Sequence, residues 1–184
     1  MQIKDLVPKI IEDETVPIHI IDSKTFSCIT YLKENSNNER GLYFPNCDSL
    51  DALEYCKSTT PYSFERIKTM IRTKCTFNEI SFSVFSILHE LGHWIQYKNF
   101  IDANHNDKEF ILLYEIERAF LYSQRKIEYE KCKNNKEDVA HLMEKYEKLY
   151  ANLPTEQYAD CFALSNLEKY VMMIKKDMRT INKK

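Results

Sequence analysis

The chain has 184 residues, of which 43% are hydrophobic, so it can bury the core of one domain and wholesale disorder is excluded. Its 26 basic and 28 acidic residues give a formal net charge of -2, which offers no general attraction to nucleic acid or to an anionic membrane. No apolar run reaches the roughly 18 residues of a membrane span, and the opening sequence MQIKDLVPKIIEDE lacks the apolar stretch of a signal peptide. We therefore expect a cytoplasmic protein with no membrane or nucleic-acid partner.

The first third of the chain contains the segments that we expect to form a small sheet. Residues 17–22, 26–32 and 41–46 are short, rich in Ile, Thr, Tyr and Phe, and separated by polar residues, a pattern typical of strands. Residues 2–13 are expected to form a short helix that Pro8 interrupts or begins. The chain has only two glycines, and this scarcity favours a helix-rich fold.

The rest of the chain shows helical periodicity. Thr76 and Glu79 have the spacing of a capping box, which predicts the start of a long helix, and residues 101–107 predict a polar loop after it. The basic tail, residues 175–184, is expected to fray. The expected helices cover residues 48–57, 63–73, 76–100, 108–132, 137–151 and 154–175.

One of these helices, residues 137–151, has apolar residues at i, i+3, i+4, i+7, i+10 and i+11. This spacing predicts a single buried stripe. The stripe comprises Val139, Leu142, Met143, Tyr146, Leu149 and Tyr150. No repeat, linker or low-complexity segment interrupts the chain, so we expect one domain over residues 1–184.

The six cysteines include no CxxC pair. A chain of this length with a full core does not need disulfides for stability, and no export signal is evident. We therefore expect reduced, mostly buried thiols and no zinc site built from cysteines alone.

The sequence HELGH at residues 89–93 is an HExxH motif. His89 and His93 are four residues apart, so on a helix both imidazoles share a face and can reach one zinc ion at about 2.0–2.1 Å. Glu90 lies about 100° round the helix and can approach a water on the metal without ligating the metal itself. The motif thus predicts a zinc site with Glu90 as general base.

Gly92 lies inside this motif. A glycine within a helix costs about 1 kcal/mol relative to alanine, so its presence predicts that another backbone or helix comes close at this point. Ala159 and Ala163 share one face of the last expected helix. Their small side chains would let that helix press against the metal-bearing helix.

A catalytic zinc usually has three protein ligands, so the two histidines require a third. Asn99 stands where the metzincin pattern has its third histidine, and that pattern is therefore not met. Glu156, at the start of the last helix, is the preferred candidate, with Glu115 and Glu117 as competing acids. Asp160 lies one turn after Glu156 and can accept a hydrogen bond from the non-coordinating nitrogen of a ligand histidine.

HELGH followed by ExxAD, with FA two residues later, resembles the gluzincin metallopeptidases and most of all the phage- and prophage-associated ImmA/IrrE family. The resemblance implies an α+β, zincin-like fold, helix-rich with a small N-terminal sheet packed on the HExxH helix. It implies that His89 and His93 are zinc ligands, that Glu90 is the general base and that Glu156 is the third ligand. Asp160 stands where this family often has Asn.

The interval between the two motifs departs from the family pattern. His93 and Glu156 are 63 positions apart, more than the family's usual interval. Residues 101–152 are therefore expected to be a helical insertion that serves as a lid, a partner surface or a determinant of specificity. No helix-turn-helix segment is evident, so a fused DNA-binding regulator is not expected.

Together the motifs predict a zinc-dependent metallopeptidase that hydrolyses a protein or peptide substrate with a zinc-bound water activated by Glu90. The alternative is a zinc-binding, non-catalytic protein-interaction module of the same fold. A deformylase-like amidase also uses HExxH, but it would need a cysteine ligand and a glycine-rich loop, and this glycine-poor chain lacks the loop.

The substrate peptide is expected to lie along an edge strand formed by residues 41–46 or 26–32. A further group should stabilise the oxyanion, and the sequence does not choose among five candidates. These are Tyr97, His105, Arg118, His141 and Tyr158. The sequence makes no prediction of the oligomeric state.

Overall fold

The computed structural model describes residues 1–22, 28–32 and 39–181. These residues form a helix-rich fold with one small mixed sheet, in agreement with the expected α+β class. No helix in these ranges is long and apolar enough to cross a membrane. The elements in chain order are α1 (Ile3–Ile10), β1 (Ile18–Ile21), β2 (Ile29–Tyr31), β3 (Gly41–Pro45), α2 (Ser49–Thr59), α3 (Pro61–Arg72), α4 (Glu79–Asp102), α5 (Asp107–Cys132), α6 (Lys136–Ala151) and α7 (Pro154–Ile181).

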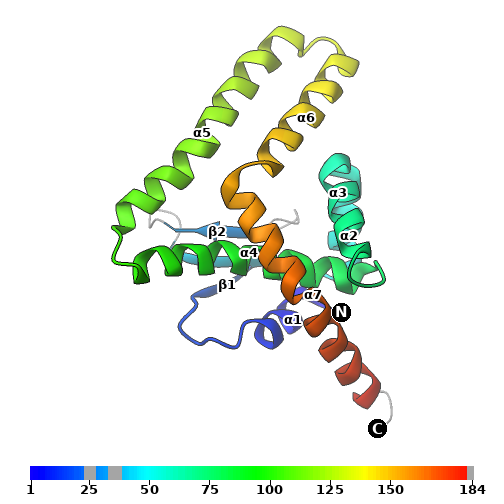
Figure 1. The fold of residues 1–184 in the computed structure, drawn as a ribbon. Helices are drawn as coiled ribbons and strands as arrows, with labels where there is room; N and C mark the ends of the chain where they lie inside the picture. The colour runs from blue at the N-terminus through cyan, green and yellow to red at the C-terminus, as the bar shows by residue number, and fades with distance from the viewer. Residues whose placement is uncertain (23–27, 33–38, 182–184) are drawn as a thin grey trace.

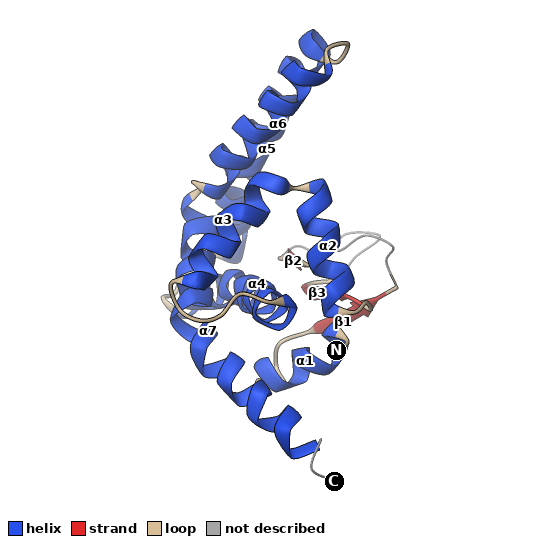
Figure 2. Cartoon of the chain, turned by 90° about the vertical axis from the view of Figure 1, so that its right-hand side faces the viewer, coloured by secondary structure: helices blue, strands red, loops and turns tan. Residues whose placement is uncertain are grey.

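Helix α4, which carries the HExxH motif, lies at the centre of the fold. Figure 2 looks nearly along α4 and shows the sheet on one side of it and α7 on the other. Figure 1 shows α7 crossing α4, with α2 and α3 near one end of α4 and the α5–α6 hairpin projecting away from the body. Both β2 and β3 contact α4, so the sheet packs on the motif-bearing helix as expected.

The sheet has the strand order β1-β3-β2, with β3 parallel to β1 and antiparallel to β2. In this register Leu42 of β3 lies opposite Ile18 on one side and Thr30 on the other. All five residues of β3 are buried. Of the two segments expected to supply the edge strand, residues 41–46 do not, because β3 pairs with β1 on one side and with β2 on the other. The part of residues 26–32 that forms β2 lies at an edge of the sheet among the described strands, while residues 26–27 lie outside the described residues.

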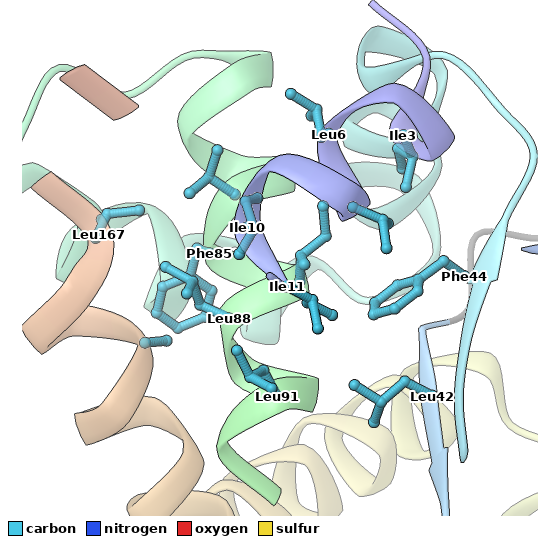
Figure 3. Packing of buried hydrophobic residues seen from close by; sticks show 14 of the residues in the cluster. Ile3, Leu6, Ile10, Ile11, Leu42, Phe44, Phe85, Leu88, Leu91 and Leu167 are labelled. Carbon is cyan, nitrogen blue, oxygen red and sulfur yellow. The ribbon is translucent and has the colours of Figure 1, made fainter. Parts of the chain in front are cut away.

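The hydrophobic core joins α1, the sheet, α4 and α7 (Figure 3). Ile3 and Leu6 of α1 and Phe44 of β3 are fully buried, and so are Leu88 of α4 and Leu167 of α7. Each of these large side chains contributes on the order of 1.5–3 kcal/mol when removed from water. The core therefore fixes α4 from three sides and leaves little freedom for the helix that carries the motif.

Helix α4 begins two residues later than its predicted capping box. Asn78 is the N-cap: the Ser81 backbone N–H donates to Asn78 Oδ1 at 2.9 Å, and the Asn78 backbone N–H donates to Ser81 Oγ at 2.9 Å. Thr76 and Glu79 are thus not the capping pair, because Asn78 and Ser81 satisfy the first amides instead. The helix ends at Asp102, two residues beyond the predicted end.

Helix α7 is longer than the sequence predicted. It continues to Ile181, so the expectation that the chain frays from residue 175 is wrong over residues 175–181. Val171 and Ile174 are buried near this end, and Lys9 of α1 donates to Asp177 at 3.0 Å. Packing against α1 therefore extends the helix past the point at which local sequence suggested an end.

The stripe predicted for α6 is only partly buried. Leu142 and Tyr146 are buried, and the Tyr146 hydroxyl donates to Glu128 of α5 at 3.0 Å. Met143 and Leu149 are 39% and 41% exposed, so the prediction of one continuous buried stripe is wrong. Helix α6 contacts α5 along the projecting hairpin and α3 and α7 nearer the body, and these described elements do not cover the full width of its apolar face.

All six cysteines are free, as expected. The expectation that most of them are buried is wrong, because five are half-buried and Cys161 is exposed. Four of the half-buried thiols, those of Cys28, Cys47, Cys56 and Cys75, pack against the hydrophobic core, as a small side chain can.

Gly92 of α4 lies against Ala159 of α7. A Cβ atom at position 92 would lie 2.9 Å from the Cα atom of Ala159 and 3.2 Å from its carbonyl oxygen. Ala159 and Ala163 are themselves fully buried. The expected close approach of a second helix to Gly92 is thus confirmed, and the neighbouring atoms are backbone atoms that a rotamer change cannot move away.

We predict that Gly92→Ala destabilises the fold by about 1–3 kcal/mol, because the added methyl group forces α4 and α7 apart. In an unhindered helix the same change would stabilise by about 1 kcal/mol. Urea unfolding followed by circular dichroism measures the difference. Ala140→Gly, at an exposed position on α6, serves as the control for helix propensity alone. An increase in stability for Gly92→Ala would contradict the prediction.

Candidate metal centre

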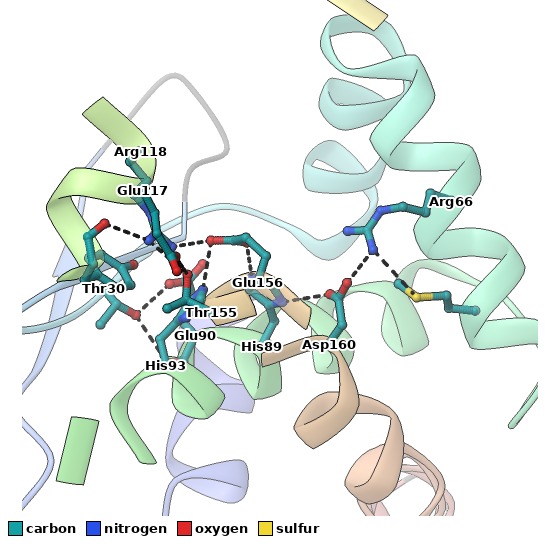
Figure 4. Close-up of polar contacts among 12 residues, drawn as sticks. Thr30, Arg66, His89, Glu90, His93, Glu117, Arg118, Thr155, Glu156 and Asp160 are labelled. Carbon is teal, nitrogen blue, oxygen red and sulfur yellow. Dashed lines mark hydrogen bonds and ion pairs between the residues drawn. The ribbon is translucent and has the colours of Figure 1, made fainter. Parts of the chain in front are cut away.

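Two adjacent turns of α4 and the first turn of α7 bring three ligand-type side chains together (Figure 4). His89 Nε2 lies 3.2 Å from Glu156 Oε2, and His93 Nε2 lies 3.4 Å from Glu156 Oε1. The three ligand atoms lie within 4.8 Å of one another. His93 and Glu156 are 2% and 3% exposed, so this group is shielded from bulk water.

These separations fit a metal ion. Two atoms that each bind a tetrahedral zinc at 2.0–2.1 Å are about 3.3 Å apart, and each histidine lies at about this distance from one of the two Glu156 oxygens. Two imidazole nitrogens and one carboxylate oxygen suit several divalent transition metals, zinc among them. Within the described ranges, this is the one group of three His, Cys, Asp or Glu side chains close enough to share an ion.

The competing acids lie elsewhere in the same region. Glu117 accepts a hydrogen bond from the Thr155 hydroxyl at 2.8 Å, and Glu115 lines the cleft without joining the group of potential ligands. The structure therefore places Glu156 beside the two histidines, in preference to Glu115 or Glu117.

The protonation states of Glu156 and of the neighbouring histidines depend on one another. Burial disfavours the ionised form of Glu156, but hydrogen bonds with His89 and His93 outweigh burial and hold the pKa of Glu156 well below its ordinary value. Burial also disfavours protonated His89, yet hydrogen bonds to Asp160 and Glu156 raise the pKa of His89 to about 10. The proton on His89 therefore supplies part of the positive charge that stabilises ionised Glu156. A metal ion bound by His89 would displace this proton and supply the positive charge instead.

Asp160 orients His89. Its Oδ1 lies 3.0 Å from His89 Nδ1, so the nitrogen that faces away from Glu156 has a carboxylate partner. Arg66 of α3 donates to the other oxygen of Asp160. This arrangement matches the predicted role of Asp160, in which a carboxylate fixes the tautomer and orientation of a ligand histidine. Arg66 was not identified from the sequence, since it lies 94 residues away and no local pattern connects the two.

His93 has a different environment. Among the described residues, its Nδ1 is buried without a hydrogen-bond partner. Its ring makes an edge-on contact with the ring of Tyr114, with centroids 5.6 Å apart. Packing therefore surrounds the Nδ1 side of this imidazole, while its Nε2 faces the Glu156 carboxylate.

Arg118 of α5 binds the carboxylate of Glu156. Its guanidinium donates to Glu156 Oε1, to the Thr155 hydroxyl at 3.1 Å and to the Tyr114 carbonyl at 3.2 Å. It also stacks over the Tyr114 ring at 3.4 Å. The sequence singled out Arg118 only as one of several possible oxyanion groups, because its contact with Glu156 depends on how α5 folds back over α4.

The other four candidates for oxyanion stabilisation lie away from this group. Tyr97 donates to Asp107 at 2.6 Å, and His105 stacks on Phe100. Tyr158 accepts from Asn99 at 3.2 Å, while His141 lies on the projecting hairpin. Of the five, Arg118 is the one that lines the cleft beside the histidines.

A cleft of about 720 Å³ opens onto the histidines and Glu156. Its walls come from β2, α4, α5 and the ends of α6 and α7. Glu90 lies in this cleft, and the Thr30 hydroxyl of β2 donates to Glu90 Oε2 at 2.7 Å. Thr30 was not identified from the sequence, because a threonine in a strand gives no signal of a partner 60 residues away.

Comparisons with known protein families, with curated proteins and with solved structures each find no match. The geometry and chemistry of this cleft are therefore the basis for assigning a function. They are also the basis for the two predictions that follow.

We predict that Glu156→Gln lowers zinc affinity by more than about 100-fold, because it replaces an ionised ligand with a neutral amide. Glu117→Gln is the matched control and should change affinity by less than about threefold. Competition with a chromophoric chelator measures both dissociation constants, and His93→Ala should lose the metal as well. If Glu156→Gln and Glu117→Gln lowered zinc affinity equally, the choice of Glu156 as the third ligand would be wrong.

We predict that Asp160→Asn lowers zinc affinity by about 10- to 100-fold without removing a ligand. The amide can present a donor to His89 Nδ1 where the carboxylate accepts, so the imidazole loses its orientation. The same chelator assay gives the magnitude, with Asp177→Asn on the same helix as a control. Unchanged zinc affinity in Asp160→Asn would show that the hydrogen bond does not tune the site.

Proposed function

We propose that this chain is a zinc-dependent metallopeptidase with a zincin-like fold, of the gluzincin type and related to the ImmA/IrrE family. One observation carries the proposal: His89, His93 and Glu156 converge within 4.8 Å in an open cleft that also holds Glu90. A structural metal site would be closed by protein ligands, whereas this group supplies three and faces a cleft.

A zinc ion held by these three residues would lower the pKa of a bound water and polarise the carbonyl of a peptide. Glu90 is the residue placed to take a proton from water and to deliver it to the leaving amine. The Thr30 hydroxyl, which donates to Glu90 Oε2 at 2.7 Å, positions this carboxylate in the cleft. Arg118 lines the cleft and donates to Glu156. Its positive charge can also stabilise the oxyanion that develops on the substrate carbonyl.

The cleft suits an extended peptide. One edge of β2 pairs with β3, and residues 28–32, which include β2, line the cleft. A peptide can add to the free edge of a strand through backbone hydrogen bonds. No other described strand pairs with β2, so its second edge provides a place for substrate next to Glu90, whereas β3, paired on both sides, does not.

The cytoplasm is the compartment that we propose for this activity. All six cysteines are free, and Cys161 is exposed. Free thiols persist in a reducing compartment and tend to pair in an oxidising one.

We predict that Glu90→Gln keeps zinc but lowers peptide cleavage by at least about 100-fold, because the amide cannot accept the proton. Zinc-loaded wild type and variant would be incubated with a proteome-derived peptide library, and new termini would be identified by mass spectrometry. Glu79→Gln, on the same helix outside the cleft, is the control.

The outcome separates the two functions expected from the motifs. New termini with wild type and Glu79→Gln, but not with Glu90→Gln, support the peptidase. A wild-type protein that binds one zinc per chain and produces no new termini would instead identify a non-catalytic interaction module of the same fold.

A further inference from the structure

The outer face of α5 carries large apolar side chains that no other described element covers. We name them the outer stripe; each exposes 51–65% of its surface. The members are Leu112, Leu113, Ile116, Phe120 and Ile127. Their spacing places them along one side of the helix, over roughly 22 Å at 1.5 Å per residue.

The outer stripe is distinct from the cleft. The residues of α5 that line the cleft are Ile111, Tyr114, Glu115, Arg118 and Tyr122, and none of them belongs to the stripe. The stripe also faces away from α6, because Leu121 and Arg125, the α5 residues that line a pocket shared with Tyr146 of α6, lie more than about 120° round the helix from the centre of the stripe. Figure 1 shows this helix at the border of the projecting hairpin. Neither the fold nor the proposed activity accounts for so much exposed apolar surface.

We propose that the outer stripe is a dimer interface, at which α5 packs antiparallel against α5 of a second copy of this chain. An apolar stripe along one side of a long helix is the pattern by which helices pair. Five large side chains, each about half exposed, present on the order of 400–600 Å² of apolar surface, as large as the biggest patch on a typical monomer. With their polar neighbours they approach the roughly 800 Å² per partner of a stable interface.

The charges beside the stripe favour a second copy in the antiparallel orientation. Glu109 lies on the side of the stripe toward its N-terminal end, and Lys131 lies on the same side toward its C-terminal end. An antiparallel pair centred near Phe120 brings Glu109 toward the partner subunit's Lys131. A parallel pair would place like charges together.

Other features agree with this orientation. Glu130, the acid at the basic end, is already paired with Lys133 at 2.6 Å. The antiparallel arrangement opposes the helix dipoles and closes the assembly by a twofold axis. Because the cleft lies on another side of α5, both clefts stay accessible in the dimer. The proposal is therefore independent of the proposed peptidase activity.

Sedimentation equilibrium of the full chain tests the proposal. The wild type should reach twice the 22.0 kDa chain mass between 1 and about 100 μM. Ile116→Lys and Phe120→Lys should each raise the dimer dissociation constant by more than about 30-fold, because each buries an unpaired charge at the interface. Met172→Lys on α7, equally exposed in the structure, is the control and should leave the dimer intact.

Circular dichroism shows whether each variant is folded, and the exposed positions make unfolding an unexpected result. A wild type that stays monomeric at 100 μM overturns the proposal. A dimer that survives both Ile116→Lys and Phe120→Lys also overturns it, since the interface would then lie elsewhere.

A charge exchange tests the orientation. Glu109→Lys and Lys131→Glu should each weaken the antiparallel dimer by about three- to tenfold, because each creates two like-charge contacts. The double variant should return the dissociation constant to within about threefold of wild type. In a parallel dimer each residue faces its own copy, so neither single change would weaken association, and that result would overturn the antiparallel arrangement.

Discussion

The close contact between α4 and α7 at Gly92 is the constraint on which the candidate metal centre depends. Two of the three ligand-type residues come from one helix and the third from the other, so the separation of the helices sets the separation of their ligand atoms. Gly92 directly precedes His93, and Ala159 lies one turn after Glu156. A methyl group between the backbones would move Glu156 by a distance comparable to the roughly 0.2 Å tolerance of a metal–ligand bond.

The second requirement is electrostatic. Two carboxylates, Glu156 and Asp160, are buried side by side, and burying charge is costly unless each charge is paired and hydrogen-bonded. His89 lies between them, while Arg118 and Arg66 bind their outer oxygens. The two arginines come from α5 and α3, which carry no ligand. The position of the carboxylates therefore depends on helices that supply none of the three ligand-type side chains.

Local rules predicted the parts of the site that a single helix determines. The spacing of His89 and His93, and that of Glu156 and Asp160, places each pair on one face, and the glycine in the motif indicated a close neighbour. The features that the sequence did not predict depend on contacts between distant segments. They include the central place of β3 in the sheet. They also include the residues that bind the carboxylates of Glu90, Asp160 and Glu156, which are Thr30, Arg66 and Arg118 respectively. The start of α4 was missed for a local reason, since two alternative caps lie two residues apart and only the hydrogen bonds distinguish them.

The long α5–α6 hairpin between the motifs also has a consequence for biosynthesis. Because translation proceeds from the N-terminus, both imidazoles leave the ribosome well before the residues of α7 are made. Until then the nascent chain holds only two of the three ligand-type side chains. The group is therefore complete only once α7 has been made, and the proposed hydrolytic activity cannot arise earlier.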